Sequence, residues 1–297
     1  MTGPTLAVQD LGKSFGSVRA VDGLSFTVRP GAVTGFLGPN GAGKTTTLRM
    51  LLGLTTPSQG RTLVGDRAYG QHRVPASMVG AALEASSFHP GRSGRGHLEV
   101  YAGQAGVGRA RCQELLDFVG LGPAADRRVG GYSMGMRQRL GLATALLADP
   151  PAIVLDEPAN GLDPEGIRWM RGLLRGFAAE GRTVLVSSHL LSEVQHTVDD
   201  VVIIAHGRLV HASSLEELAG LAEPETYVES PAPEQLARVA GDRGWTTRAD
   251  GAGLVVAGVP AADVGAAAYA SGIELHQLAS RGVGLEDVFL RLTGETR

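Results

Sequence analysis

Short apolar runs separated by glycine- and proline-rich turns divide the first 221 residues into alternating strands and helices. Strands are predicted where short apolar runs lie between turn residues, and helices where longer mixed segments follow a turn. The predicted strands are 6–11, 24–28, 33–37, 61–64, 78–83, 151–157, 183–187, 201–205 and 208–211. The predicted helices are 45–54, about 97–106, 110–120, 134–148 and 164–180. This alternation predicts an α/β domain with a mixed sheet core.

Within that domain, the stretch 85–96 is rich in glycine, serine and proline and is predicted to be a loop. Three helices follow it closely and are joined by glycines. We therefore expect a small helical subdomain, about 85–148, inserted in the α/β core.

The composition changes after residue 221, where glutamate- and proline-containing turns mark a domain boundary. The elements predicted beyond it are strand 226–229, helix 233–240, strands 245–248 and 253–258, helix 261–270, strand 273–279 and helix 285–292. This order predicts a small α+β domain of the ferredoxin-like type. The expected domains are thus 1–221 and 222–297.

The whole-chain composition narrows the range of partners. The net charge is −3, from +2 over residues 1–221 and −5 over residues 222–297, so we expect no nucleic-acid partner. No secretory signal and no apolar run long enough for a membrane span are visible, so any membrane role is expected to come through a partner protein. The single cysteine, Cys112, excludes an intrachain disulfide and fits a reducing cytosol.

The sequence GPNGAGKTT at residues 38–46 matches a phosphate-binding loop between a buried strand and a helix. Glycines in such a loop let backbone N–H groups converge on phosphate oxygens, and the positive end of the following helix points at the same anion. Lys44 is expected to reach the phosphates, and the Thr45 hydroxyl to ligate Mg²⁺. The predicted nucleotide-binding residues here are Gly38, Pro39, Asn40, Gly41, Ala42, Gly43, Lys44, Thr45 and Thr46.

Two acids end the apolar run at 151–157, and a histidine follows the strand at 183–187. Asp156 is placed to bind Mg²⁺, and Glu157 to orient and activate water. An isolated Asp-Glu pair is a weak signal, but a phosphate loop upstream makes it strong. A lone histidine at such a position is usually a helix-start residue, but after a strand beside the Asp156 strand His189 can equally contact the γ-phosphate. Phe15, before the first nucleotide strand, either stacks on adenine or is a half-buried strand residue.

Together these motifs resemble those of an ATP-binding cassette (ABC) ATPase, over about residues 5–220. The deciding motif is YSMGMRQRL at 132–140, which is similar to the ABC signature; Ser133 and Gly135 match the usual Leu-Ser-Gly-Gly-Gln form. The motif NGLD at 160–163, with Asp163, resembles the D-loop, and His189 resembles the switch histidine. Glu84 stands where most members carry the Q-loop glutamine, and its carboxylate is a further candidate for Mg²⁺.

The resemblance implies how such a subunit works. Two copies, or two paired ABC subunits, face each other head to tail, so that each ATP lies between one loop and the partner's signature. Lys44, Thr45 and Asp156 would hold Mg-ATP, Ser133 and Gly135 of the other copy would contact the γ-phosphate, and Glu157 and His189 would be catalytic. Closure of the dimer would drive a separate membrane permease, from the cytoplasmic face of a bacterial membrane.

Finer features resemble the bacterial drug- and bacteriocin-type exporters, including Glu84 and the C-terminal LEDVFL at 285–290. An ABC ATPase that acts on the ribosome or DNA is the alternative; such members carry two cassettes or a long coiled-coil insertion, and neither is visible here. A binding module without turnover is a third hypothesis, which Glu157 and His189 argue against. Import as the direction of transport also stays open.

Overall fold

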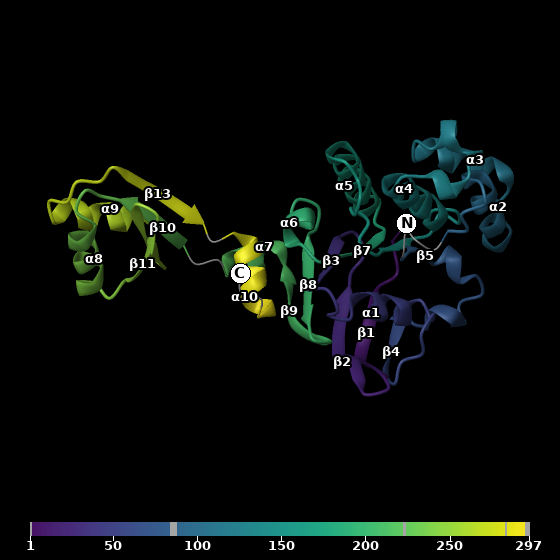
Figure 1. The fold of residues 1–297 in the computed structure, drawn as a ribbon. Helices are drawn as coiled ribbons and strands as arrows, with labels where there is room; N and C mark the ends of the chain where they lie inside the picture. Colours follow the sequence, from purple (N-terminus) through teal and green to yellow (C-terminus); the bar gives the residue numbers. More distant parts are fainter. Residues whose placement is uncertain (1, 84–87, 222–223, 283, 295–297) are drawn as a thin grey trace. The chain divides into compact units, whose positions relative to one another are not determined.

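The computed structural model describes residues 2–83, 88–221, 224–282 and 284–294 (Figure 1). Contacts within the chain divide it into two compact units, residues 1–215 and residues 216–297. We call these unit 1 and unit 2 and describe each by itself. Among the described residues, no helix has both the length and the apolar composition needed to cross a membrane.

Unit 1 contains a six-stranded sheet in the order β5-β6-β7-β3-β8-β9. Its strands are β3 (Val33–Leu37), β5 (Val79–Ala82), β6 (Ala152–Leu155), β7 (Thr183–Ser188), β8 (Asp200–Ala205) and β9 (Arg208–Ser214). Neighbouring strands are parallel except for the β8–β9 hairpin. Every residue of β3, β6 and β7 is buried, as expected of strands covered on both faces. Because parallel strands end at one edge, the residues that follow β3, β6 and β7 meet there.

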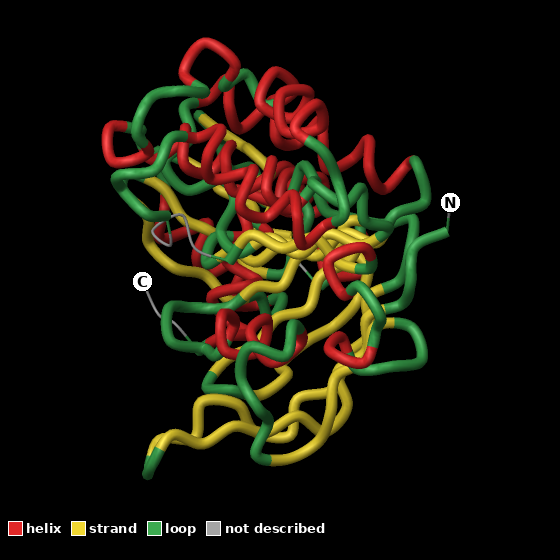
Figure 2. The backbone as a smooth tube through the Cα atoms, turned by 90° about the vertical axis from the view of Figure 1, so that its right-hand side faces the viewer, coloured by secondary structure: helices red, strands yellow, loops and turns green. Residues whose placement is uncertain are grey.

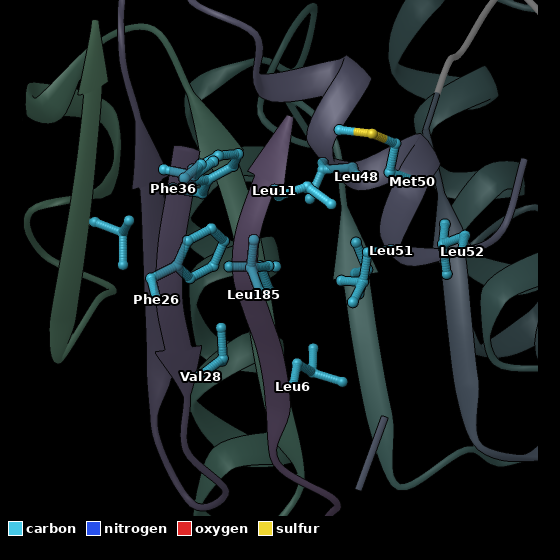
Figure 3. Close-up of a cluster of buried hydrophobic side chains, with 14 of the residues drawn as sticks. Leu6, Leu11, Phe26, Val28, Phe36, Leu48, Met50, Leu51, Leu52 and Leu185 are labelled. Atoms are coloured by element: carbon cyan, nitrogen blue, oxygen red, sulfur yellow. The ribbon is translucent and has the colours of Figure 1, made fainter. Parts of the chain in front are cut away.

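A second, antiparallel sheet in unit 1 has the order β2-β1-β4. It consists of β1 (Leu6–Phe15), β2 (Val18–Val28) and β4 (Gln59–Val64). Its apolar face, the larger sheet and helix α1 (Lys44–Leu51) enclose a common core (Figure 3). In this core the rings of Phe26 and Phe36 stack with centroids 5.1 Å apart. The core therefore holds the end of β3 and the start of α1, which bound the phosphate loop.

The chain between β5 and β6 is largely helical. Helices α2 (Gly94–Ala105), α3 (Arg109–Phe118) and α4 (Met134–Ala145) pack on one another at one end of unit 1 (Figure 1). Helix α4 also packs on β5, and Gly80 allows the close approach, since a Cβ there would lie 1.9 Å from the Ala145 carbonyl oxygen. Unit 1 also contains α5 (Pro164–Ala179) and α6 (Leu191–Val194), whereas α7 (Leu215–Gly220) has all but its first residue in unit 2. The α/β class and the mixed sheet predicted from the sequence are thus confirmed.

Unit 2 contains an antiparallel sheet in the order β11-β12-β10-β13 with two helices on one face. Its elements are β10 (Pro224–Glu229), α8 (Pro233–Asp242), β11 (Thr246–Asp250), β12 (Gly253–Ala257), α9 (Ala261–Ala270), β13 (Gln277–Gly282) and α10 (Leu285–Thr293). Figure 2 colours the helices of both units red and the strands yellow. The order β-α-β-β-α-β and the antiparallel pairing agree with the predicted ferredoxin-like arrangement.

Several predicted boundaries are wrong. The loop prediction over 85–96 extends too far, because the Ser93 hydroxyl accepts a hydrogen bond from the Gly96 N–H and α2 begins at Gly94. The last strand of unit 2 is β13, not 273–279, because Ile273 belongs to the core between sheet and helices before the strand begins. The short helices α6 and α7 were not predicted. Strands β1 and β2 extend beyond the predicted 6–11 and 24–28.

Candidate functional site

The phosphate loop, residues 38–46, connects β3 to α1 and is closely packed at two glycines. A Cβ at Gly38 would lie 2.3 Å from the carbonyl oxygen of Ile204, and Gly43 has φ 102° with its Cβ position 2.5 Å from the Ala20 carbonyl oxygen. Larger residues would displace the loop from the end of the sheet. No side chain caps the N-terminus of α1, so its first N–H groups are available to an anion.

The loop surrounds a hollow of about 260 Å³. It is lined by Ala20, Asn40, Gly41, Ala42, Gly43, Lys44, Thr45, Thr46 and Glu157. Lys44 is 6% exposed, and its Nζ donates to the carbonyl oxygens of Gly38 at 2.6 Å and Pro39 at 3.3 Å. Its Nζ also lies 3.5 Å from Oε1 of Glu157. The loop therefore presents one buried cation beside backbone donors, a combination that suits phosphate groups.

Asp156 lies directly after β6 and is almost completely buried. Its Oδ2 accepts a hydrogen bond from the Thr45 hydroxyl at 2.7 Å, and its Oδ1 accepts one from the Ser187 hydroxyl. Burial raises the pKa of Asp156, and the two hydrogen bonds oppose that rise. A hydroxyl and a carboxylate in direct contact are the oxygen ligands that Mg²⁺ prefers, so these residues fit a magnesium site.

Glu157, the next residue, contacts both the phosphate loop and the residue that follows β7. It has a left-handed backbone, φ 50°, which is uncommon for a residue with a side chain. Its Oε2 lies 2.9 Å from Nδ1 of His189, and its other carboxylate oxygen faces Lys44. The structure thus brings together Lys44, Thr45, Asp156, Glu157 and His189, which come from three separate segments of the chain.

Two residues at this site were not singled out from the sequence. The Ser187 hydroxyl accepts the Glu157 N–H at 2.9 Å, and the Gln138 amide donates to the Glu157 carbonyl oxygen at 3.1 Å. Ser187 lies in an apolar strand two residues before His189, and Gln138 lies within the signature motif. Closeness to a motif residue was therefore the signal that the sequence offered for both. The carboxylate of Glu193 also lies within 4.8 Å of the ligand atoms of Glu157 and His189.

The signature residues lie around a different hollow of about 410 Å³. Ser133 is the N-cap of α4, and its hydroxyl accepts the Met136 N–H at 3.2 Å. Gly135 packs on the D-loop, since a Cβ there would lie 3.2 Å from the Gly161 carbonyl oxygen. Asp163 caps α5 by accepting the Gly166 N–H at 2.8 Å. Ser133, Gly135 and Asp163 line this second hollow and not the hollow at the phosphate loop.

The two other predicted residues are placed differently. Phe15 ends β1, is 53% exposed, and has the Lys13 ammonium 5.0 Å from its ring centroid. Phe15 is therefore a strand residue with about half of its surface exposed, which fits both interpretations given for it, and the exposed part of its ring is accessible to a planar ligand. Glu84 lies outside the described residues.

A third hollow, about 380 Å³ and mainly apolar, lies where β5 meets the helices inserted after it. It is lined by Leu52, Leu54, Tyr69, Ala76, Val79, Gly80, Ala81, Tyr101, Gln104, Ala105, Thr144, Ala145, Leu147 and Ala148. Leu54 is 68% exposed, and the nearby Val100 and Tyr101 are also exposed. Large apolar side chains that gather around one groove are typical of a protein interaction surface.

Comparison with protein families gives two matches. The family described as "ABC transporter" matches residues 21–160, and a domain family of unknown function, DUF8746, matches residues 224–286. The uncharacterized ABC transporter ATP-binding protein YhcH of Bacillus subtilis (strain 168) is 36% identical over 296 residues, which are 98% of this chain and 97% of that protein. The bacitracin transport ATP-binding protein BcrA of Bacillus licheniformis is 42% identical over 212 residues, 70% of this chain and 69% of that protein.

A further relative and two solved structures agree with these matches. The Nod factor export ATP-binding protein I of Ralstonia nicotianae is 37% identical, over 98% of this chain and 94% of that protein. A solved ATP-binding subunit of an ABC transporter matches with a TM-score of 0.64 at 26% identity, covering 72% of this chain and 92% of that one. A dimeric bacterial ABC transporter cassette matches with a TM-score of 0.65 at 20% identity, over 71% and 98%, which concerns the fold alone.

Proposed function

Because this chain belongs to the family of ABC transporter ATP-binding proteins, we propose that it hydrolyses ATP for an exporter whose membrane-spanning subunits are separate chains. Members of this family are the ATP-hydrolysing subunits of transporters. The observation that carries the proposal is the convergence of Lys44, Thr45, Asp156, Glu157 and His189 at one edge of the sheet.

Each residue at that edge has a role that its contacts support. Lys44 and the free N–H groups of α1 bind the phosphates, and Thr45 and Asp156 ligate Mg²⁺. The metal, when bound, neutralises charge that develops on the phosphates. Glu157 accepts a hydrogen bond from the attacking water and orients it, and His189 holds the phosphate in line. The exposed face of Phe15 is assigned to adenine.

We assign Ser133 and Gly135 to the ATP site of a second copy. These residues line a hollow separate from the phosphate loop, so within one chain they do not close over a nucleotide held there. In a head-to-tail dimer the N-terminal end of α4 would face the γ-phosphate of the partner's ATP. Asp163 would border the same contact. The phosphate loop is accordingly half of a site, and a homodimer or a pair of related subunits completes it.

The membrane permease is assigned to the apolar hollow beside β5. Of its lining residues, Leu54 and Tyr101 are exposed, and an apolar helix from the permease would cover them. Docking there would place the subunit on the cytoplasmic face of the membrane. Because α4 packs on β5, the groove adjoins the helix that carries the signature, and a closing dimer would move its occupant.

The relatives favour export of a drug, an antibiotic or a peptide. The names of BcrA and of the Ralstonia relative refer to bacitracin transport and Nod factor export. Such names favour a transporter over the alternative hypothesis, an ATPase that acts on the ribosome or DNA. We further propose that residues 1–221 form the ATPase domain, with a helical subdomain at about 85–148, and that residues 222–297 form an accessory domain.

The substitution Glu157→Gln tests the catalytic assignment. Glutamine has nearly the same size as glutamate, but its neutral amide lacks the negative charge with which the carboxylate attracts a proton of the attacking water. We expect ATP binding to persist, ATP to induce a stable dimer, and turnover to fall at least about 100-fold. The measurements are steady-state ATPase activity and dimer formation by size exclusion with ATP. Wild-type turnover in the variant would refute the role of Glu157.

A further inference from the structure

We propose that Ser187 is a positioning residue for ATP hydrolysis, which fixes Asp156 and Glu157 relative to each other. The inference rests on the proposed roles of those two acids and adds a residue that the motifs do not contain. Ser187 is completely buried near the end of β7. Its hydroxyl donates to Oδ1 of Asp156 and accepts the backbone N–H of Glu157 at 2.9 Å.

The position of Ser187 follows from strand pairing. Leu155 of β6 pairs with Val186 of β7, so the next residue of β7 lies beside the first residues after β6. Those residues are Asp156 and Glu157. On its other side β7 pairs with β3, where Ser187 is opposite Phe36, near the start of the phosphate loop. Ser187 thus lies between the strand that ends in the two acids and the strand that leads to the nucleotide.

The hydrogen bond to Glu157 acts where the backbone is strained. A left-handed conformation costs free energy for a residue with a side chain and persists only when its surroundings hold it. The Ser187 hydroxyl holds the N–H of Glu157, and Gln138 holds its carbonyl group. The resulting turn directs the Glu157 carboxylate towards Lys44 and His189 instead of along the line of β6.

The Ser187 hydroxyl donates one hydrogen bond and accepts another at the same time. It donates to the carboxylate of Asp156, which is assigned to Mg²⁺, and it accepts from the backbone N–H of Glu157, which is assigned to the attacking water. The relative position of the Asp156 and Glu157 side chains therefore depends on this group. A small change in that position would be costly, because aligned attack contributes strongly to the rate. The other buried hydroxyl at this end of β7, Ser188, contacts Leu190 and Glu193 instead.

The test compares Ser187→Ala with Thr183→Val. Thr183 is on the same strand, is also completely buried, and donates to the Pro4 carbonyl oxygen at 2.7 Å, away from the site. We expect Ser187→Ala to lower kcat roughly 10- to 100-fold, with ATP affinity in EDTA changed less than about threefold. The Mg²⁺ concentration for half-maximal activity should rise several-fold. Thr183→Val should keep kcat and the Mg²⁺ requirement even if its melting temperature falls.

A kcat of Ser187→Ala within about twofold of wild type would overturn the inference, as would an equal loss in both variants. Glu157→Gln, assayed in parallel, separates this failure from failure of the proposed function. If Glu157→Gln is inactive and Ser187→Ala is normal, only the role of Ser187 is refuted. If Glu157→Gln hydrolyses ATP normally, the catalytic assignment itself is wrong. The double variant Ser187→Ala/Glu157→Gln should have nearly the same kcat as Glu157→Gln alone, because both substitutions impair the same function, the orientation of the attacking water.

Discussion

His97 makes the stability of unit 1 depend on pH. This residue of α2 is 4% exposed and lies between the rings of Phe88 and Tyr101, with centroid distances of 4.7 and 4.9 Å. Its Nδ1 is buried and has no hydrogen-bond partner among the described residues. Burial, with a smaller contribution from Arg92, lowers the pKa of His97 from 6.5 to about 4. The folded chain therefore keeps this ring neutral where the unfolded chain protonates it.

The sign and size of the effect follow from that difference. Between pH 4 and 6.5 the unfolded chain binds more protons at His97, so the free energy of unfolding rises with pH. The stabilising contribution is complete above pH 6.5 and is lost as the pH falls towards 4. The slope is at most about 1.4 kcal/mol per pH unit, and the total at most about 3 kcal/mol.

The assay is urea unfolding at several pH values between 4.5 and 8. A Trp245→Phe background leaves Trp169 of α5 as the fluorescent probe of unit 1. His97→Gln removes the titrating ring, and His196→Gln, at an exposed histidine, is the control. We expect His97→Gln to be less stable at pH 8, because it loses ring contacts, but to show a flatter dependence on pH below 6.5. Parallel curves for wild type and His97→Gln would refute the reasoning.

Two further predictions concern the metal and the permease. Thr45→Val removes the hydroxyl that contacts Asp156; we expect the Mg²⁺ needed for half-maximal ATPase activity to rise about tenfold, with ATP affinity in EDTA nearly unchanged. An unchanged Mg²⁺ requirement would count against this site. Leu54→Asp puts a charge on the rim of the apolar groove, where it should alter stability by less than about 0.5 kcal/mol and leave the isolated ATPase intact. Co-purification with the membrane subunit should fall, and normal recovery of the complex would argue for another docking surface.

Much of the fold could be predicted from the sequence because the central strands are continuous apolar runs. β3, β6 and β7 are buried on both faces, and strands buried in this way consist almost entirely of apolar residues. The four-residue helix α6 was missed because it is too short to show a helical period. β13 was placed too early because Ile273, an apolar core residue, looks the same in sequence whether it lies in a strand or before one.

The candidate site could be predicted where its residues are contiguous in sequence. The phosphate loop and the Asp-Glu pair each form a short motif with a direct chemical meaning. Ser187 could not be found in this way, because its contacts with Asp156 and Glu157 depend on β7 being the neighbour of β6. Nor does a sequence record that Glu157 has a left-handed backbone. Such features depend on strand order and therefore require the folded structure.

In the proposed dimer two chains share each ATP site, and a mixture of two inactive variants tests this arrangement. Lys44→Ala removes the cation of the loop, and Ser133→Arg blocks the signature surface. Each variant alone should be inactive, since both of its sites contain the defect. A mixed dimer has one intact site, so an equal mixture should recover up to roughly a quarter of wild-type activity. Activity no higher than that of the two separate variants would contradict the shared site.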